Sequence, residues 1–165
     1  MIGRDLPSLI HTANELAKFP IAGIDLNLGC PAPIVCRKDA GGGLLRNPET
    51  VNRLIGSLRE AISGRFTVKT RLGYHSENEF PKLLEIFRSH AIDGLTIHGR
   101  TVLERYQTPV HPDFVKMAVE TMACPVIANG NVIDVETGLA YFAKTAAAGL
   151  MIGRGAIRNP WIFHS

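Results

Sequence analysis

The sequence predicts an α/β fold built on about five parallel strands, and three observations support this prediction. Five short runs of apolar and β-branched residues are bounded by Gly, Pro and polar residues, as buried strands are. The segments between these runs carry apolar residues at helical spacing. The two patterns alternate without a linker, a low-complexity tract or a charge block, which is typical of a parallel sheet with crossover helices.

The predicted strands are short and contain few charged side chains. They cover residues 23–27, 66–70, 94–98, 125–129 and 149–153. Such runs suit strands that are covered on both faces.

The clearest helical pattern begins at Asn47 and Pro48, which supply an N-cap and a proline at the first helical position. Its apolar stripe consists of Val51, Leu54, Ile55, Leu58 and Ile62, and the pattern ends near residues 63–64. Further helices are expected over residues 10–17, 80–87, 114–122 and 139–146, the last of them capped by Asp134.

Composition excludes several classes of protein. The 165 residues are 45% hydrophobic and 20% charged, which favours a soluble globular chain over a disordered one. No apolar run approaches the roughly 18 residues of a membrane span, and the start lacks a secretory apolar region. Three cysteines without a CxxC pair and six histidines without HExxH predict neither a disulfide scaffold nor a metal site. A reducing, cytoplasmic location is therefore expected.

Polar or glycine-rich residues follow every predicted strand at its carboxyl end. These groups are Asn27 to Pro31, Lys69 with Arg71, His98 to Thr101, Asn129-Gly130-Asn131 and Gly153-Arg154-Gly155. Ligands of parallel α/β folds bind beyond the carboxyl ends of the strands, so five such ends indicate one shared site. The alternative is that Asn-Gly and Gly-Arg-Gly serve only as turns.

Three side chains at these strand ends suggest specific chemistry. Lys69, in mid-strand, is either a cation aimed at an anionic or electron-accepting ligand or a lysine that reaches water. Cys30 is either an exposed thiol that exchanges a proton or a small buried residue. Gly153 and Arg154 follow the last strand, where backbone amides and a guanidinium could bind phosphate. No role is predicted for Cys36 or Cys124.

These motifs, in their order along the chain, resemble the tRNA-dihydrouridine synthases. The segments that carry the resemblance are residues 25–31, followed by the glycine run 41–45, and then residues 68–73, 98–101, 128–130, 151–156 and 159–161. The resemblance covers nearly the whole chain, and residues 25–31 and 98–101 are its most specific parts.

The resemblance implies an FMN-dependent enzyme that reduces uridine in tRNA to 5,6-dihydrouridine, with NADPH as the reductant. It implies that Cys30 is the catalytic proton donor. The residues that it implies for FMN binding are Lys69, His98, Asn129, Gly130, Asn131, Gly153 and Arg154. The residues that it implies for substrate binding are Asn27, Arg71, Arg100 and Tyr106. It implies no metal and no membrane.

The resemblance also implies that residues 1–165 form a single partial (β/α)8 TIM barrel. The family's first strands have no counterpart before residue 24, and its C-terminal helical tRNA-binding domain has none after the last strand. An open sheet has two unpaired edges, which predicts self-association and impaired activity. Two other functions stay open: a different FMN barrel acting on a free small molecule, such as a dihydroorotate dehydrogenase-like enzyme, and a non-catalytic RNA-binding remnant.

Overall fold

The structure is a computed structural model, and it describes residues 1–164. Five strands form one parallel sheet in sequence order: β1 (Ile24–Asn27), β2 (Phe66–Arg71), β3 (Gly94–His98), β4 (Val126–Asn129) and β5 (Gly149–Met151). The expected number and direction of the strands are confirmed, and each predicted boundary lies within two residues of the observed one. The α/β class predicted from the sequence is therefore confirmed.

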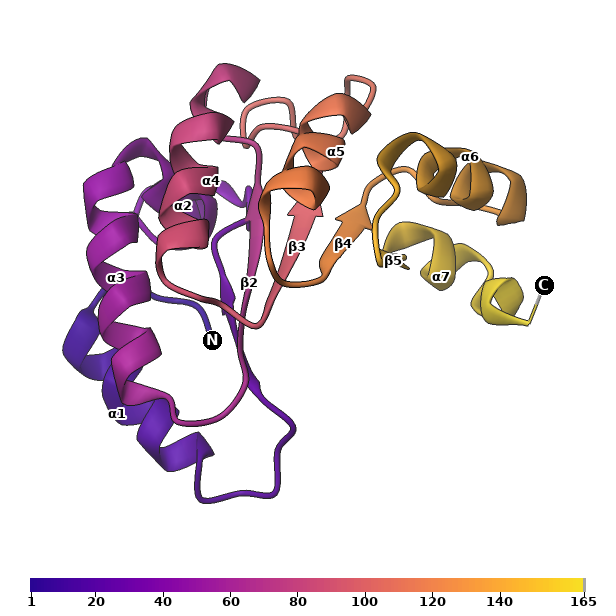
Figure 1. The fold of residues 1–165 in the computed structure, drawn as a ribbon. Helices are drawn as coiled ribbons and strands as arrows, with labels where there is room; N and C mark the ends of the chain where they lie inside the picture. Colours follow the sequence, from indigo (N-terminus) through magenta and orange to yellow (C-terminus); the bar gives the residue numbers. More distant parts are fainter. Residues whose placement is uncertain (165) are drawn as a thin grey trace.

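Helices connect the strands, as the alternation predicts. They are α1 (Leu6–Leu16), α3 (Pro48–Ala61), α4 (Phe80–Ser89), α5 (Pro112–Thr121) and α6 (Val135–Thr145). Shorter elements are α2 (Pro33–Cys36), α7 (Arg154–Arg158) and the 3-10 turns η1 (Gly41–Arg46), η2 (Glu77–Glu79) and η3 (Pro160–Phe163). Figure 1 shows α1, α3, α4 and α5 along one side of the strands, with α6 and α7 beyond the last strand.

Local sequence explains where the longer helices begin. The Asn47 side chain accepts a hydrogen bond from the Thr50 amide, and Pro48 occupies the first position of α3. Asp134 and Thr137 form a reciprocal capping box at the start of α6. Both helix starts were expected from the sequence.

Alternation along the strands creates two different faces. The side chains that pack toward the helices are buried and apolar; they include Leu26, Val68, Ile97 and Ala128. The alternate positions are largely polar, and they include Asp25, Thr67, Lys69 and His98. Asp25 is exposed and Lys69 is half-buried, so the expectation of strands covered on both faces is wrong for this inner face. The inner face is the one that is free to carry a polar site.

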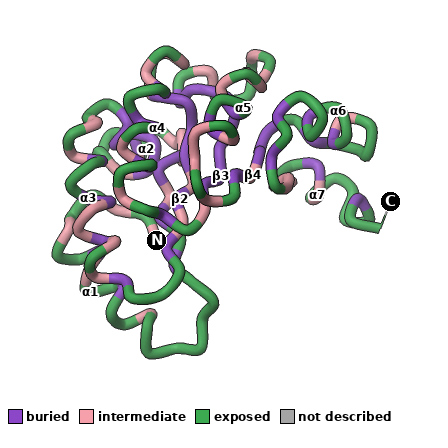
Figure 2. The backbone as a smooth tube through the Cα atoms, in the orientation of Figure 1, coloured by how far each residue is buried: buried purple, intermediate pink, exposed green. Residues whose placement is uncertain are grey.

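The two edges of the sheet differ. The Met1 amino group donates to the Asp25 carbonyl at 2.5 Å, and the Asn27 amide donates to the Met1 carbonyl at 2.9 Å. This pair of bonds is a parallel bridge on the outer edge of β1, which partly occupies that edge. Near β5, by contrast, Leu139 and Phe142 of α6 are exposed, and the backbone is mostly exposed beyond β4 (Figure 2).

No helix among residues 1–164 is long and apolar enough to cross a membrane.

Candidate active site

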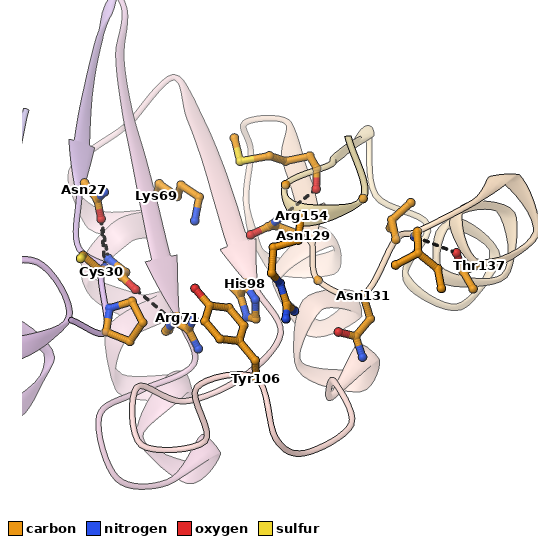
Figure 3. Close-up of a pocket in the computed structure, with 18 of the residues that line it drawn as sticks. Asn27, Cys30, Lys69, Arg71, His98, Tyr106, Asn129, Asn131, Thr137 and Arg154 are labelled. Carbon is orange, nitrogen blue, oxygen red and sulfur yellow. Dashed lines mark hydrogen bonds between the residues drawn. The ribbon is translucent and has the colours of Figure 1, made fainter. Parts of the chain in front are cut away.

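A cavity of about 660 Å³ opens at the carboxyl ends of the strands. Side chains from all five strand ends line it, so the strand ends predicted to share one site do surround a single cavity (Figure 3). The cavity brings together these predicted residues: Asn27, Cys30, Lys69, Arg71, His98, Tyr106, Asn129, Gly130, Asn131, Gly153 and Arg154. Arg100 is the one predicted site residue that does not line it.

Arg100 is buried, with 1% of its surface exposed. Its guanidinium donates from Nε and Nη2 to the Thr108 carbonyl, the former at 2.6 Å. Arg100 thus holds the loop after β3, and its side chain lies outside the lining of the cavity in which it was expected.

A side-chain turn shapes the backbone at Cys30. The Asn27 Oδ1 atom accepts hydrogen bonds from the amides of Gly29 at 2.9 Å and Cys30 at 3.1 Å. This arrangement bends the chain sharply as it leaves β1. Among residues 1–164, the Asn27 Nδ2 group has no hydrogen-bond partner, so it remains able to donate to a ligand. Cys30 is half-buried at the cavity, which leaves its thiol accessible.

The glycine run of η1 packs directly behind Cys30. The Gly42 amide donates to the Cys30 carbonyl at 3.0 Å. A Cβ on Gly42 would lie 2.8 Å from that carbonyl oxygen, so any larger residue would displace it. Cys36, to which the sequence assigned no role, donates from Sγ to the same carbonyl at 3.4 Å. Burial raises the pKa of the Cys36 thiol, which keeps it protonated as a donor.

The cavity is cationic. Lys69, Arg71, Arg154 and Arg158 line it, and none of its described lining residues carries a carboxylate. Burial and the neighbouring Arg71 lower the pKa of Lys69 from its ordinary value. This environment favours an anionic ligand, because such a ligand would relieve the repulsion between the cations.

His98 is a buried side chain with an unsatisfied nitrogen. Its Nδ1 atom has no hydrogen-bond partner among the described residues, although the side chain is only 6% exposed. Burial first, and then the positive charges of Arg71 and Lys69, lower the pKa of His98 to about 3. The imidazole is therefore neutral at physiological pH, and His98 lines the cavity with its buried Nδ1 atom unpaired among the described residues.

Tyr106 projects into the cavity from the loop after β3. Its ring makes an edge contact with His98, with 5.9 Å between the ring centroids. The Arg154 guanidinium lies over the same ring, with its Cζ 4.1 Å from the centroid. Tyr106 thus connects the loop after β3 with the start of α7 across the mouth of the site (Figure 3).

Other lining residues were not singled out by the sequence, and they include Val132, Ile133, Thr137 and Met151. Met151 could have been found, because it shares the inner face of the sheet with Asn129 of the neighbouring strand. The Asn129 Nδ2 group donates to the Met151 carbonyl at 2.7 Å and so ties these strands together. No cluster of three or more potential metal ligands occurs among residues 1–164.

Solved structures share this arrangement of strands and helices. A putative dihydrodipicolinate synthase family protein from Coccidioides immitis has a TM-score of 0.61 at 16% identity, over 90% of this chain and 46% of that one. The N-acetylneuraminate lyase of Mycoplasma synoviae has a TM-score of 0.62 at 14% identity, over 94% of this chain and 54% of that one. At these identities the matches show the fold alone. The fold of this chain is part of a TIM barrel, as the sequence predicts.

Sequence relatives are more specific. The chain is 36% identical over 162 residues to tRNA-dihydrouridine synthase B of Pasteurella multocida, covering 98% of this chain and 49% of that protein. It is 32% identical over 162 residues to the tRNA-dihydrouridine(16) synthase of Neisseria meningitidis serogroup A, covering 97% of this chain and 49% of that protein. The chain therefore spans about half the length of these relatives.

A family model described as "Dihydrouridine synthase (Dus)" matches residues 1–165, which is the whole chain. The chain belongs to the dihydrouridine synthase family.

Proposed function

We propose that the chain carries the catalytic centre of an FMN-dependent tRNA-dihydrouridine synthase, which reduces uridine in tRNA to 5,6-dihydrouridine with NADPH as reductant. The observation that carries this proposal is the meeting of an accessible thiol, Cys30, with a carboxylate-free cationic cavity at the ends of the strands. Family membership supports it, because the relatives are named as tRNA-dihydrouridine synthases.

The cavity suits FMN, a ligand with a phosphate dianion and a polar ring edge. Arg154 offers a guanidinium to the phosphate, and Gly153 beside it has no neighbouring atom within 4 Å of a Cβ position. The neutral imidazole of His98 and the Nζ atom of Lys69 would meet the ring system. Asn129, Gly130 and Asn131 would complete this side of the binding site.

When bound and reduced, FMN supplies the hydride for C6 of the uracil ring. The chain's own task is the second half of the reduction. The Cys30 thiol would donate its proton to C5, since general-acid catalysis requires a positioned proton donor. The free Nδ2 group of Asn27 would hold a uracil carbonyl oxygen beside that thiol.

The substrate base would reach this cavity only after leaving its stack in the tRNA. Tyr106, with 48% of its surface exposed at the cavity mouth, offers an aromatic face for the extruded base. Arg158, which is exposed and lines the cavity, adds positive charge where the flanking phosphates would approach.

The test uses the purified chain with FMN, NADPH and an unmodified tRNA transcript, and measures dihydrouridine by mass spectrometry of the digested RNA. Binding of FMN is followed separately by quenching of its fluorescence. We expect Cys30→Ala to bind FMN normally and to lose at least about 100-fold in uridine reduction, the usual contribution of a general acid.

Cys124→Ala is the matched control, because Cys124 lies just before β4, at the opposite end of the strands from the cavity. Equal reduction of free uridine and tRNA would favour a small-molecule flavin enzyme. Absence of FMN binding would contradict the proposal outright.

A further inference from the structure

Arg71 is the charged side chain of the cavity that lies between the loop after β1 and the loop after β3. It ends β2, the strand between β1 and β3, so loops carrying functional side chains leave the sheet on both sides of it. The loop after β1 carries Cys30, and the loop after β3 carries Tyr106. Only 2% of the Arg71 surface is exposed.

The guanidinium of Arg71 is hydrogen bonded to both of these loops. Its Nε atom donates to the Gly29 carbonyl at 3.0 Å, next to Cys30. Its Nη1 atom donates to the Thr101 carbonyl at 2.9 Å and to the Arg105 carbonyl at 3.0 Å. The three acceptors are backbone carbonyls on two loops that are far apart in sequence, and the planar, rigid guanidinium reaches all of them.

The loop after β3 adopts an unusual backbone conformation where it accepts a hydrogen bond from Arg71. Arg105 has a φ of 51°, in the left-handed region that residues other than glycine rarely adopt. Its carbonyl is one of the Arg71 acceptors, and the next residue is Tyr106, whose ring centroid lies 5.3 Å from the Arg71 Cζ. The Arg71 guanidinium thus contacts both the backbone just before Tyr106 and the Tyr106 ring itself.

We infer that Arg71 is a positioning residue: it sets the Cys30 thiol and the Tyr106 ring relative to each other by locking their two loops together. A substrate contact alone would require none of the three backbone bonds. The inference rests on the proposed function for the roles of Cys30 and Tyr106, but the coupling between the loops exists in the chain without FMN or tRNA.

Lys69 provides a matched control. It lies on the same strand two residues away, lines the same cavity and carries the same charge. Unlike the guanidinium of Arg71, the Lys69 ammonium makes no hydrogen bond to another residue in the range 1–164. Lys69→Gln therefore removes a cation from the cavity without removing a connection between loops.

The experiment measures amide hydrogen exchange and Cys30 alkylation on the ligand-free chain. The variants are Arg71→Gln, Arg71→Lys and Lys69→Gln. Peptides covering residues 28–31 and 101–108 report the two loops, and peptides from α3 report global opening. Iodoacetamide alkylation is followed against pH by tandem mass spectrometry, which resolves Cys30 from Cys36.

Both Arg71 variants should accelerate exchange in the two loops together, by at least about tenfold, which corresponds to the loss of one charge-assisted hydrogen bond. Exchange in α3 should stay unchanged. The plateau rate of Cys30 alkylation at high pH, which reports the accessibility of the thiol, should shift severalfold. Lys69→Gln should leave amide exchange in both loops and the plateau rate of Cys30 alkylation unchanged.

Arg71→Lys keeps the charge and one donor group, so it is the decisive variant if Arg71→Gln fails to fold. Three results would overturn the inference. The first is an unchanged amide exchange rate in both loops, and the second is faster exchange in one loop only. The third is exchange that rises equally in α3 while the alkylation of Cys30 stays the same. None of these readouts involves FMN or tRNA, so failure of the proposed function would not be mistaken for failure of this inference.

Discussion

The Arg154 guanidinium lies over the ring of Tyr106, with Cζ 4.1 Å from the ring centroid. A contact of this kind leaves N–H groups of the guanidinium available for hydrogen bonds. The tyrosine therefore orders the arginine without consuming its donors. Tyr106 and Arg154 come from different connections, the first from the loop after β3 and the second from the start of α7.

This relationship predicts unequal effects of the two residues on FMN affinity. Arg154→Gln should weaken binding by about tenfold to a hundredfold, because a charge-assisted hydrogen bond contributes roughly 1.5–3 kcal/mol. Tyr106→Leu should weaken it by about fivefold or less, since a cation–π contact at an exposed site contributes roughly 0.5–1 kcal/mol. Fluorescence titration of FMN measures both.

Lys38→Gln serves as the charge control for this comparison, because Lys38 is exposed and does not line the cavity. Its affinity should match that of the unmodified chain. An Arg154 variant that binds FMN as tightly as the control would remove Arg154 from the phosphate site.

Asn27 should show two separable roles. Asn27→Ala removes the acceptor of the Gly29 and Cys30 amides and should cost about 1–2 kcal/mol of stability. Asn27→Asp keeps an oxygen acceptor and should retain most of that stability. Both variants lack the Nδ2 donor, so both should lose about tenfold or more in uridine reduction.

Urea unfolding and the tRNA assay measure these two effects independently. If Asn27→Asp reduced uridine at the unmodified rate, the carboxamide would serve the turn alone.

The elements best predicted from the sequence are those whose signals are local. The Asn47-Pro48 start of α3 and the Asp134 cap of α6 were both found because capping needs only neighbouring residues. The four-residue helix α2 was missed, since a single turn has no apolar period. A pair of hydrogen bonds between Thr101 and Glu104 was missed as well, although the two residues have the spacing of a capping box. The Thr101 amide donates to the Glu104 carboxylate at 2.7 Å, and the Glu104 amide donates to the Thr101 hydroxyl at 3.3 Å.

Burial was harder to predict, because it depends on which neighbour covers a side chain. Leu139 and Phe142 of α6 fit an apolar stripe, yet they are 65% and 44% exposed, and Gly138, Tyr141 and Thr145 form the buried side. For the same reason, Arg100 was expected at the cavity surface. The path of its loop, which brings the Thr108 carbonyl to its guanidinium, is a tertiary feature without a local sequence signal.

His98 should make the stability of the chain depend on pH. Burial, with Arg71 and Lys69 nearby, lowers its pKa to about 3 from an ordinary value of 6.5. Between these values the unfolded chain binds a proton that the native chain does not, so stability rises with pH and is fully present above about 6.5. His98→Asn should remove about 2 kcal/mol of the difference in unfolding free energy between pH 7 and pH 5.

Urea unfolding at the two pH values, with His11→Asn on the exposed surface of α1 as the control, measures this difference. If the His98 variant kept the full pH dependence of the unmodified chain, the imidazole would have to accept a proton in the folded state.

Gly43 should tolerate no side chain, because the backbone of Cys36 faces it. A Cβ there would lie 2.6 Å from the Cys36 carbonyl oxygen and 2.9 Å from its Cα, and neither atom can turn away as a side chain can. Gly43→Ala should therefore cost roughly 1–3 kcal/mol of stability, the usual cost of overpacking. Because Cys36 donates to the Cys30 carbonyl, the displacement should also lower uridine reduction.

Gly64→Ala is the control, since nothing lies within 4 Å of its Cβ position. Urea unfolding of the two variants side by side gives the comparison, and equal stabilities would mean that η1 can move away from Cys36 without cost.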